Sequence, residues 1–154
     1  MERRAFLTTT TATLGVGVAG CLGTLEQSSA DVPSEIRSVD IEKNADAGGD
    51  YPGGTDPPRI VFADEDSTVH IEGRIIYGSS TCGAYELRRT EYDEADGSLE
   101  VLVAAYNDAE PGEDCTADED SSAYRVDIEF DTGIPAQVTA LEQNTFEVYE
   151  ATKP

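Results

Sequence analysis

His70 is the only histidine in the chain, so any serine-type nucleophile that needs a histidine base would have to use it. Strand-like alternation groups His70 with Thr68, Glu72 and Arg74 on a polar face, which predicts a solvated side chain. The run 78–83 (GSSTCG) contains three hydroxyl residues but lacks the G-x-S-x-G elbow of hydrolases, and we interpret it as a turn. Because no P-loop, dinucleotide fingerprint or HExxH motif is present either, we expect no catalytic residue and no cofactor.

Acidic clusters are the other residues that could do chemistry, since hard cations such as Ca²⁺ prefer oxygen ligands. The chain carries 32 Asp and Glu residues, but none of the acidic runs matches the EF-hand loop. In a chain this acidic, clusters arise from composition alone, so we expect a hydrated acidic surface rather than a metal site. The weak metal candidates are Asp93, Asp96, Asp118 and Asp120.

The first residues have the composition of an export signal. Arg3 and Arg4 form a basic start, and the segment that follows, up to residue 20, is uncharged and small or apolar. That segment is too short to span a membrane, which needs about 20 apolar residues, and its glycines disfavour a buried N-terminal helix. The two arginines followed by Phe6 and Leu7 resemble a twin-arginine export signal.

A second motif directly adjoins this signal. Val18, Ala19, Gly20 and Cys21 resemble a lipobox, and the resemblance implies cleavage before Cys21 and lipidation of its thiol. One acyl chain binds a membrane only marginally, and the acidic body cannot add electrostatic attraction, so we expect a two-chain lipid. The membrane is then a partner, and the protein is predicted to lie on its outer face. The predicted segments are a signal peptide (1–20), a lipidated cysteine with a flexible tether (21–34) and one domain (35–154).

The net charge restricts the remaining partners. The chain has 10 Lys and Arg residues, and its formal net charge is -22. A charge of this sign repels nucleic acids, so a DNA- or RNA-binding role is excluded. Concentrated salt would screen the self-repulsion, because the Debye length falls to about 3 Å at 1 M. The scarcity of lysine beside abundant Asp and Glu resembles the acidic, lipid-anchored proteins that halophilic archaea export.

The predicted domain is patterned as β-strands throughout. In the clearest strand, 123–130, Tyr124, Val126, Ile128 and Phe130 alternate with polar residues. Similar or weaker patterns predict strands over 36–42, 59–63, 68–77, 84–92, 98–106, 136–142 and 145–149. About eight short strands separated by turn residues predict an all-β fold: a single immunoglobulin-like β-sandwich, with a small β-barrel as the alternative.

Asp96-Gly97 lies between two of these strands and predicts a hairpin. If Tyr92 pairs with Ser98, then Ala84 pairs with Tyr106 at the open end of the hairpin.

The two cysteines of the domain are predicted to form a disulfide. Cys82 lies at the open end of the hairpin, and Cys115 lies in the loop that leaves the same end. The lipobox accounts for Cys21, and export would remove the remaining pair from the reducing cytosol. A redox or metal-binding role is disfavoured, because the pair lacks CxxC spacing.

Three functions remain open on these grounds. The first is a lipid-anchored, non-enzymatic binding or interaction module whose ligand is unknown. The second is an envelope protein that binds a cation or a cationic solute through its acidic loops. The third is a secreted hydrolase that uses carboxylates alone, which requires two carboxylates at a fixed separation in a cleft. Tyr51 and Tyr77, which lie in or beside Gly-rich loops, are the first aromatic candidates for ligand contact, although packing of those loops is the expected role.

Overall fold

The structure is a computed structural model that describes residues 33, 35–45, 49–144 and 147–154. Within these ranges the chain forms eight β-strands and a single turn of 3₁₀ helix, η1. The elements are β1 (Ile36–Lys43), β2 (Arg59–Ala63), η1 (Asp64–Asp66), β3 (Thr68–Gly78), β4 (Gly83–Asp93), β5 (Ser98–Asn107), β6 (Asp120–Phe130), β7 (Gln137–Gln143) and β8 (Val148–Lys153).

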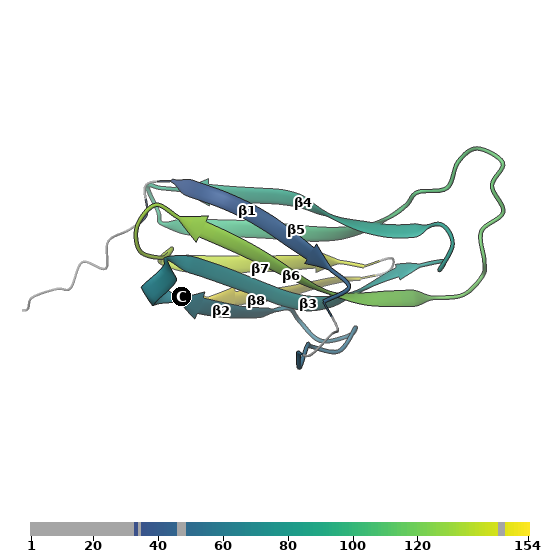
Figure 1. Cartoon of the computed structure of the whole chain (residues 1–154), viewed down its shortest axis with the longest axis horizontal. Helices are drawn as coiled ribbons and strands as arrows, with labels where there is room; N and C mark the ends of the chain where they lie inside the picture. The colour runs from purple at the N-terminus through teal and green to yellow at the C-terminus, as the bar shows by residue number, and fades with distance from the viewer. Residues whose placement is uncertain (1–32, 34, 46–48, 145–146) are drawn as a thin grey trace, which may run out of the picture.

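The strands form two four-stranded sheets that pack face to face (Figure 1). Sheet A has the order β1-β6-β3-β2, and sheet B has the order β4-β5-β7-β8. Neighbouring strands are antiparallel except for β5 and β7, which run parallel. The predicted β-sandwich is therefore confirmed, and the alternative barrel does not form because each sheet ends in two edge strands.

The core lies between the sheets and follows the alternation seen in the sequence. Tyr124, Val126, Ile128 and Phe130 of β6 are at most 1% exposed, and they share the core with Leu99, Val101 and Val103 of β5. Burying one such side chain fully contributes about 1.5–3 kcal/mol. The two inner faces therefore hold the sheets together.

The β4–β5 hairpin departs from the predicted register near its turn. Ala84 pairs with Tyr106 as predicted, but Tyr92 pairs with Leu99 instead of Ser98. A β-bulge in the middle of β4 adds one residue to that strand, which shifts the pairing on the turn side. Because β4 is an edge strand, the bulge also hinders pairing with another sheet.

The last strand starts later than predicted, at Val148. The side-chain oxygen of Asn144 accepts a hydrogen bond from the Glu147 backbone nitrogen (2.6 Å), and the Asn144 backbone nitrogen donates to the Glu147 carbonyl (3.0 Å). This Asn-based turn reverses the chain before β8 begins. Residues 145–146, where the strand was expected to start, lie outside the described residues.

The two ends of the elongated sandwich differ. At the end where β1 begins, called the tether end here, the Tyr92 hydroxyl donates a hydrogen bond to the Pro33 carbonyl (2.7 Å). At the opposite end, called the disulfide end, loop 108–119 between β5 and β6 extends beyond the sheets (Figure 1). The predicted signal, the lipobox and most of the tether lie outside the described residues. Among the residues that are described, no helix is long and apolar enough to span a bilayer.

Candidate binding site at the disulfide end

A disulfide joins Cys82 to Cys115, with their Cα atoms 5.6 Å apart, as the sequence predicts. Cys82 lies in the short connection between β3 and β4 and is 3% exposed, whereas Cys115 lies in loop 108–119. The Asp108 backbone nitrogen donates to the Cys82 carbonyl (2.7 Å), which attaches the start of the loop to the same connection. The loop carries six acidic residues and no basic residue, so the disulfide holds in place a segment that repels itself.

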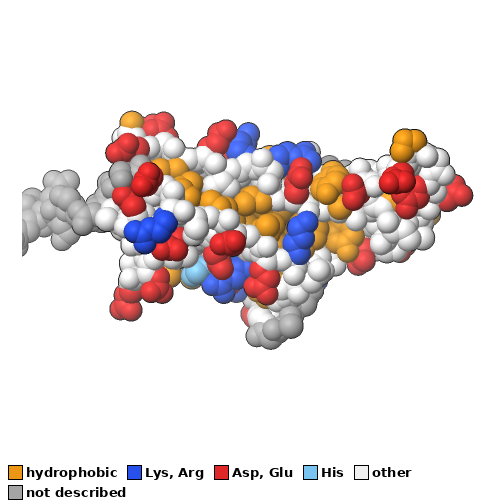
Figure 2. All heavy atoms as spheres, turned by 45° about the horizontal axis from the view of Figure 1, so that its top comes forward, with side chains coloured by type: hydrophobic (Ala, Val, Ile, Leu, Met, Phe, Trp, Pro, Cys, Tyr) orange, Lys and Arg blue, Asp and Glu red, His pale blue; other side chains and the backbone are white. Residues whose placement is uncertain are grey.

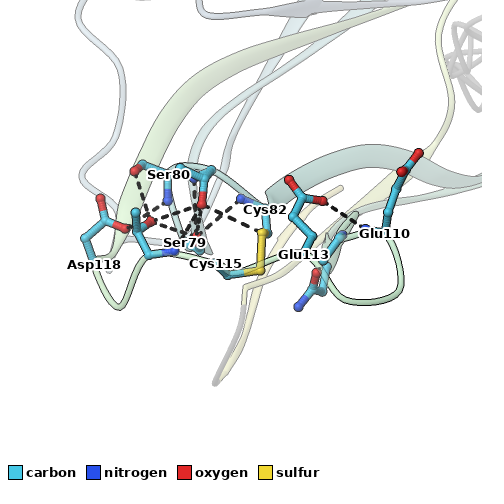
Figure 3. Close-up of a disulfide and its surroundings, with 11 residues drawn as sticks. Ser79, Ser80, Cys82, Glu110, Glu113, Cys115 and Asp118 are labelled. Atoms are coloured by element: carbon cyan, nitrogen blue, oxygen red, sulfur yellow. Dashed lines mark hydrogen bonds between the residues drawn. A yellow bond between two sulfur atoms is a disulfide. The ribbon is translucent and has the colours of Figure 1, made fainter.

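A cluster of hydroxyl groups and one carboxylate lies beside the disulfide (Figure 3). The Ser79 Oγ lies 3.1 Å from the Thr81 Oγ1 and 2.9 Å from the Thr116 Oγ1. Asp118 accepts hydrogen bonds from the Ser80 backbone nitrogen (3.1 Å) and from the Thr116 hydroxyl. Hydrogen bonds from Ser80 and then from Thr116 lower the pKa of Asp118 to about 2. The cluster fastens loop 108–119 to the β3–β4 connection, which agrees with the predicted turn.

His70 is too far away to act as a base for these hydroxyls. It lies in β3, eight residues before Gly78 at the end of the strand, which corresponds to about 26 Å of extended chain. Its Nδ1 lies 2.6 Å from the Asp127 Oδ1, and the Arg125 Nε donates to the same oxygen (2.7 Å). Burial acts to raise the pKa of Asp127, but the hydrogen bonds from Arg125 and His70 outweigh it and lower that pKa. His70 therefore faces outward as predicted, but it is partnered and its side chain is only 19% exposed.

A pocket of about 280 Å³ opens at the disulfide end, where β3, β5 and β7 end and β4 begins. Its polar and aromatic lining comes from Tyr77, Ser79, Tyr106, Asn107, Gln143 and Asn144, and the rest is glycine and alanine. No charged side chain is part of this lining. Of the two tyrosines singled out in the sequence, Tyr77 lines the pocket and Tyr51 does not.

Gly83 forms one wall of this pocket and cannot carry a side chain. A Cβ at Gly83 would lie 2.4 Å from the Tyr77 carbonyl oxygen and 2.6 Å from the Ser79 carbonyl oxygen. Both of these contacts are with backbone, which cannot move aside. The Gly83 nitrogen donates to the Ser79 carbonyl (2.7 Å), so the close approach is part of the turn.

Three tyrosine rings lead from the pocket into the core. The ring centroids of Tyr77 and Tyr85 are 5.7 Å apart, and those of Tyr85 and Tyr124 are 6.4 Å apart. The Tyr85 hydroxyl is 3.0 Å from the Ser122 Oγ, and the Tyr124 hydroxyl donates to the Glu142 Oε2 (2.8 Å). The pocket therefore rests on a series of packed aromatic rings, each of which also has a polar contact.

Glu142 is a fully buried carboxyl group in a core that is otherwise almost entirely apolar. Its Oε1 has no hydrogen-bond partner among the described residues. Burial raises the pKa of Glu142 to about 7, against the lowering effect of the hydrogen bond from Tyr124. No sequence motif singles out Glu142, although its alternation with the buried Val138 and Ala140 in β7 indicates an inward-facing position.

Gly73 provides the space for this buried pair. A Cβ at Gly73 would lie 2.5 Å from both the Glu142 Oε2 and the Tyr124 hydroxyl oxygen. Tyr124 is opposite Gly73 in the pairing of β3 with β6. The glycine therefore lets a carboxyl group from sheet B reach a tyrosine of sheet A.

The acidic residues proposed as weak metal ligands do not come together. Asp93 and Asp96 lie near the tether end, in and beside the β4–β5 turn, while Asp118 and Asp120 lie at the disulfide end. Asp118 is held by the hydroxyl cluster, and Asp120 accepts a hydrogen bond from the Tyr77 hydroxyl (3.0 Å). Across the described part of the chain, no group of three or more His, Cys, Asp or Glu residues is arranged to hold a metal ion.

A seam of half-buried hydrophobic side chains runs between the edge strands β1 and β4. Figure 2 shows hydrophobic side chains along one side of the molecule, with charged side chains on both flanks. Lys43 crosses the seam near the disulfide end, where its Nζ donates to the Tyr85 carbonyl (2.6 Å). The half-buried residues are Ile36, Val39, Ile41, Leu87 and Tyr92.

Comparison with protein-family models, with curated proteins and with solved structures gave no match for this chain. The site must therefore be judged on its own chemistry. The pocket and the hydroxyl cluster offer hydrogen-bonding groups and aromatic surface. Asp118, the carboxylate in contact with the cluster, has a pKa lowered to about 2, which makes it a weak base. The arrangement provides the polar and aromatic groups of a small binding site.

Proposed function

We propose that the chain is exported, anchored through a lipid on Cys21 to the outer face of the cell membrane, and used there as a non-enzymatic binding module. In this proposal the pocket and loop 108–119 at the disulfide end form the binding surface. The residues that resemble an export signal and a lipobox would direct export and lipid attachment, and the β-sandwich would hold the binding surface in a fixed shape.

The observation that carries the proposal is the position of the two ends. The segment before β1 joins the sandwich at the tether end, where Pro33 contacts Tyr92. Loop 108–119 lies at the opposite end of the long axis (Figure 1), and the pocket is lined by residues at the same ends of β3, β5 and β7. A membrane anchor on residue 21 would therefore present the disulfide end away from the membrane, where a ligand or partner can reach it.

Two further features support the same proposal. The Cys82–Cys115 disulfide suits an oxidising compartment, because the cytosol keeps most thiols reduced. The strongly acidic chain suits concentrated salt, in which the repulsion among its carboxylates is screened.

The anchor is tested by mass spectrometry of the native protein. We expect a chain that begins at Cys21, carries a two-chain lipid and partitions into the detergent phase. Cys21→Ser should abolish both the cleavage and the lipid, while Arg3→Lys with Arg4→Lys, which keeps the charge, should stop export by the twin-arginine route. A native chain that still begins at Met1, with an unmodified Cys21 thiol, would contradict the proposal.

The orientation is tested with one lysine at each end of the domain. Glu110→Lys places an amine in the exposed loop 108–119, and Glu94→Lys places one in the exposed β4–β5 turn. On intact cells a bulky amine-reactive polymer should label the first variant several-fold faster than the second. Solubilising the membrane should remove the difference. Equal rates on intact cells would contradict this orientation, and labelling only after lysis would contradict export.

A further inference from the structure

We infer that the pocket at the disulfide end binds a neutral, polyhydroxylated ligand such as a single sugar ring of a glycan. This inference rests on the proposed function, because it names the class of ligand that the presented end would take. Three properties of the pocket carry it: the charge of its lining, its hydrogen-bonding groups and its size.

The charge of the lining excludes ionic ligands. The chain has a formal net charge of -22, yet none of the nine residues that line the pocket is charged. A cation would lose water without gaining a carboxylate in the lining to pair with, which is unfavourable. An anion would be repelled by loop 108–119, whose first residue, Asp108, follows directly after the lining residue Asn107.

The lining offers donors and acceptors that the protein itself does not use up. The Tyr106 hydroxyl and the side-chain amide of Gln143 form no hydrogen bond among the described residues. A hydroxyl and an amide can each donate and accept, which matches the adjacent hydroxyl groups of a sugar. Tyr77 and Tyr106 are the two aromatic residues of the lining, and aromatic rings supply apolar surface for the C–H groups of a sugar.

The pocket is small and its walls are held in place. Its volume of about 280 Å³ lies near the lower end of the range for ligand pockets, which favours one ring over a long chain. Tyr77 is fixed by its stacking on Tyr85 and by the hydrogen bond from its hydroxyl to Asp120 (3.0 Å). The nearby disulfide fixes the β3–β4 connection. A preformed wall lowers the entropy lost on binding.

Nuclear magnetic resonance titration of the full chain carrying Cys21→Ser tests this inference. Three probes share one ring and differ in charge: methyl glucoside, glucosamine and glucuronate, together with methyl galactoside and methyl mannoside as further neutral rings. We expect at least one neutral glycoside, at millimolar concentration, to shift the backbone amide signals of Gly83, Asn107 and Gln143. Because the ligand is neutral, the dissociation constant should change little with salt concentration.

Two variants tie the binding to the pocket. Gln143→Ala and Tyr106→Ala should each weaken the affinity about 5- to 10-fold, the effect of losing one or two good contacts. Gln143 is exposed, so its replacement leaves the core intact. Thr139→Ala on the same strand, away from the pocket, is the matched control and should leave the affinity unchanged.

Each other outcome overturns the inference. Stronger binding of glucosamine or glucuronate than of every neutral ring would show that the pocket selects charge. No shift with any neutral ring, or shifts outside the pocket that survive both variants, would show that the pocket does not bind this class. The anchor and orientation experiments above are independent of these titrations, so failure here is distinguishable from failure of the proposed function.

Discussion

Breaking the Cys82–Cys115 disulfide should lower the free energy of unfolding by about 4 kcal/mol, the chain-entropy value for a sequence separation of 33. The variant to use is Cys115→Ser, because Cys115 is exposed and the buried Cys82 side chain then stays unchanged. We expect this loss in denaturant unfolding in molar salt, together with faster amide exchange in loop 108–119.

Reduction of the unmodified chain is the control for this substitution. If the disulfide acts by restricting the unfolded chain and the acidic loop, the reduced protein should match Cys115→Ser in stability. A loss below about 1 kcal/mol would mean that the hydrogen bonds of the hydroxyl cluster alone hold the loop. The binding that we propose for the adjacent pocket should weaken as the β3–β4 connection loses order.

Glu142 should make the fold less stable as the pH rises, and Glu142→Gln should remove this dependence. Burial raises the pKa of Glu142 from 4.5 to about 7, so the folded state holds a proton that the unfolded chain releases. The stabilisation is complete below pH 4.5 and is lost as the pH rises toward 7. The total is about 3 kcal/mol, from about 1.4 kcal/mol for each pH unit of the shift.

The comparison should be made as unfolding free energy against pH, from pH 4 to 8, in molar salt. The other carboxylates titrate in both proteins, so the difference between the two curves reports Glu142. That difference should grow by about 3 kcal/mol in favour of Glu142→Gln. Glu150→Gln removes a carboxylate from an exposed position on the adjacent strand β8 and should give no such change. Parallel curves for the unmodified chain and Glu142→Gln would show that Glu142 ionises normally in the folded state.

Tyr124→Phe separates the two effects on the pKa of Glu142, namely the hydrogen bond that lowers it and the burial that raises it. The Tyr124 hydroxyl is the one donor to the Glu142 carboxyl among the described residues. Removing it takes away the effect that lowers the pKa, so the loss of stability with rising pH should extend to higher pH and become larger in total. The two predictions together place the redox-dependent stability of the domain at the disulfide beside the pocket, and its pH-dependent stability at Glu142 beneath the pocket.

The sequence by itself determined the parts of the structure that depend on neighbours along the chain. The alternation in 123–130 predicted β6, because a strand with one buried face repeats every two residues. The disulfide could be predicted for a similar reason. With Cys21 assigned to the lipobox, Cys82 and Cys115 were the one remaining pair, and the predicted hairpin placed both cysteines at the same end of the domain. The signal and lipobox remain predictions, since they lie outside the described residues.

Only the tertiary structure decided which strands lie side by side and what each inward-facing residue meets. The alternation in β5 and β7 does not reveal that they pair in parallel, because strand order depends on packing between distant segments. The pocket is likewise assembled from the ends of four strands, and its lining residues are spread over the sequence from Tyr77 to Asn144. Glu142 is the clearest case: its position in β7 indicates an inward side chain, but its raised pKa depends on Tyr124 and on the space at Gly73, which only folding brings together.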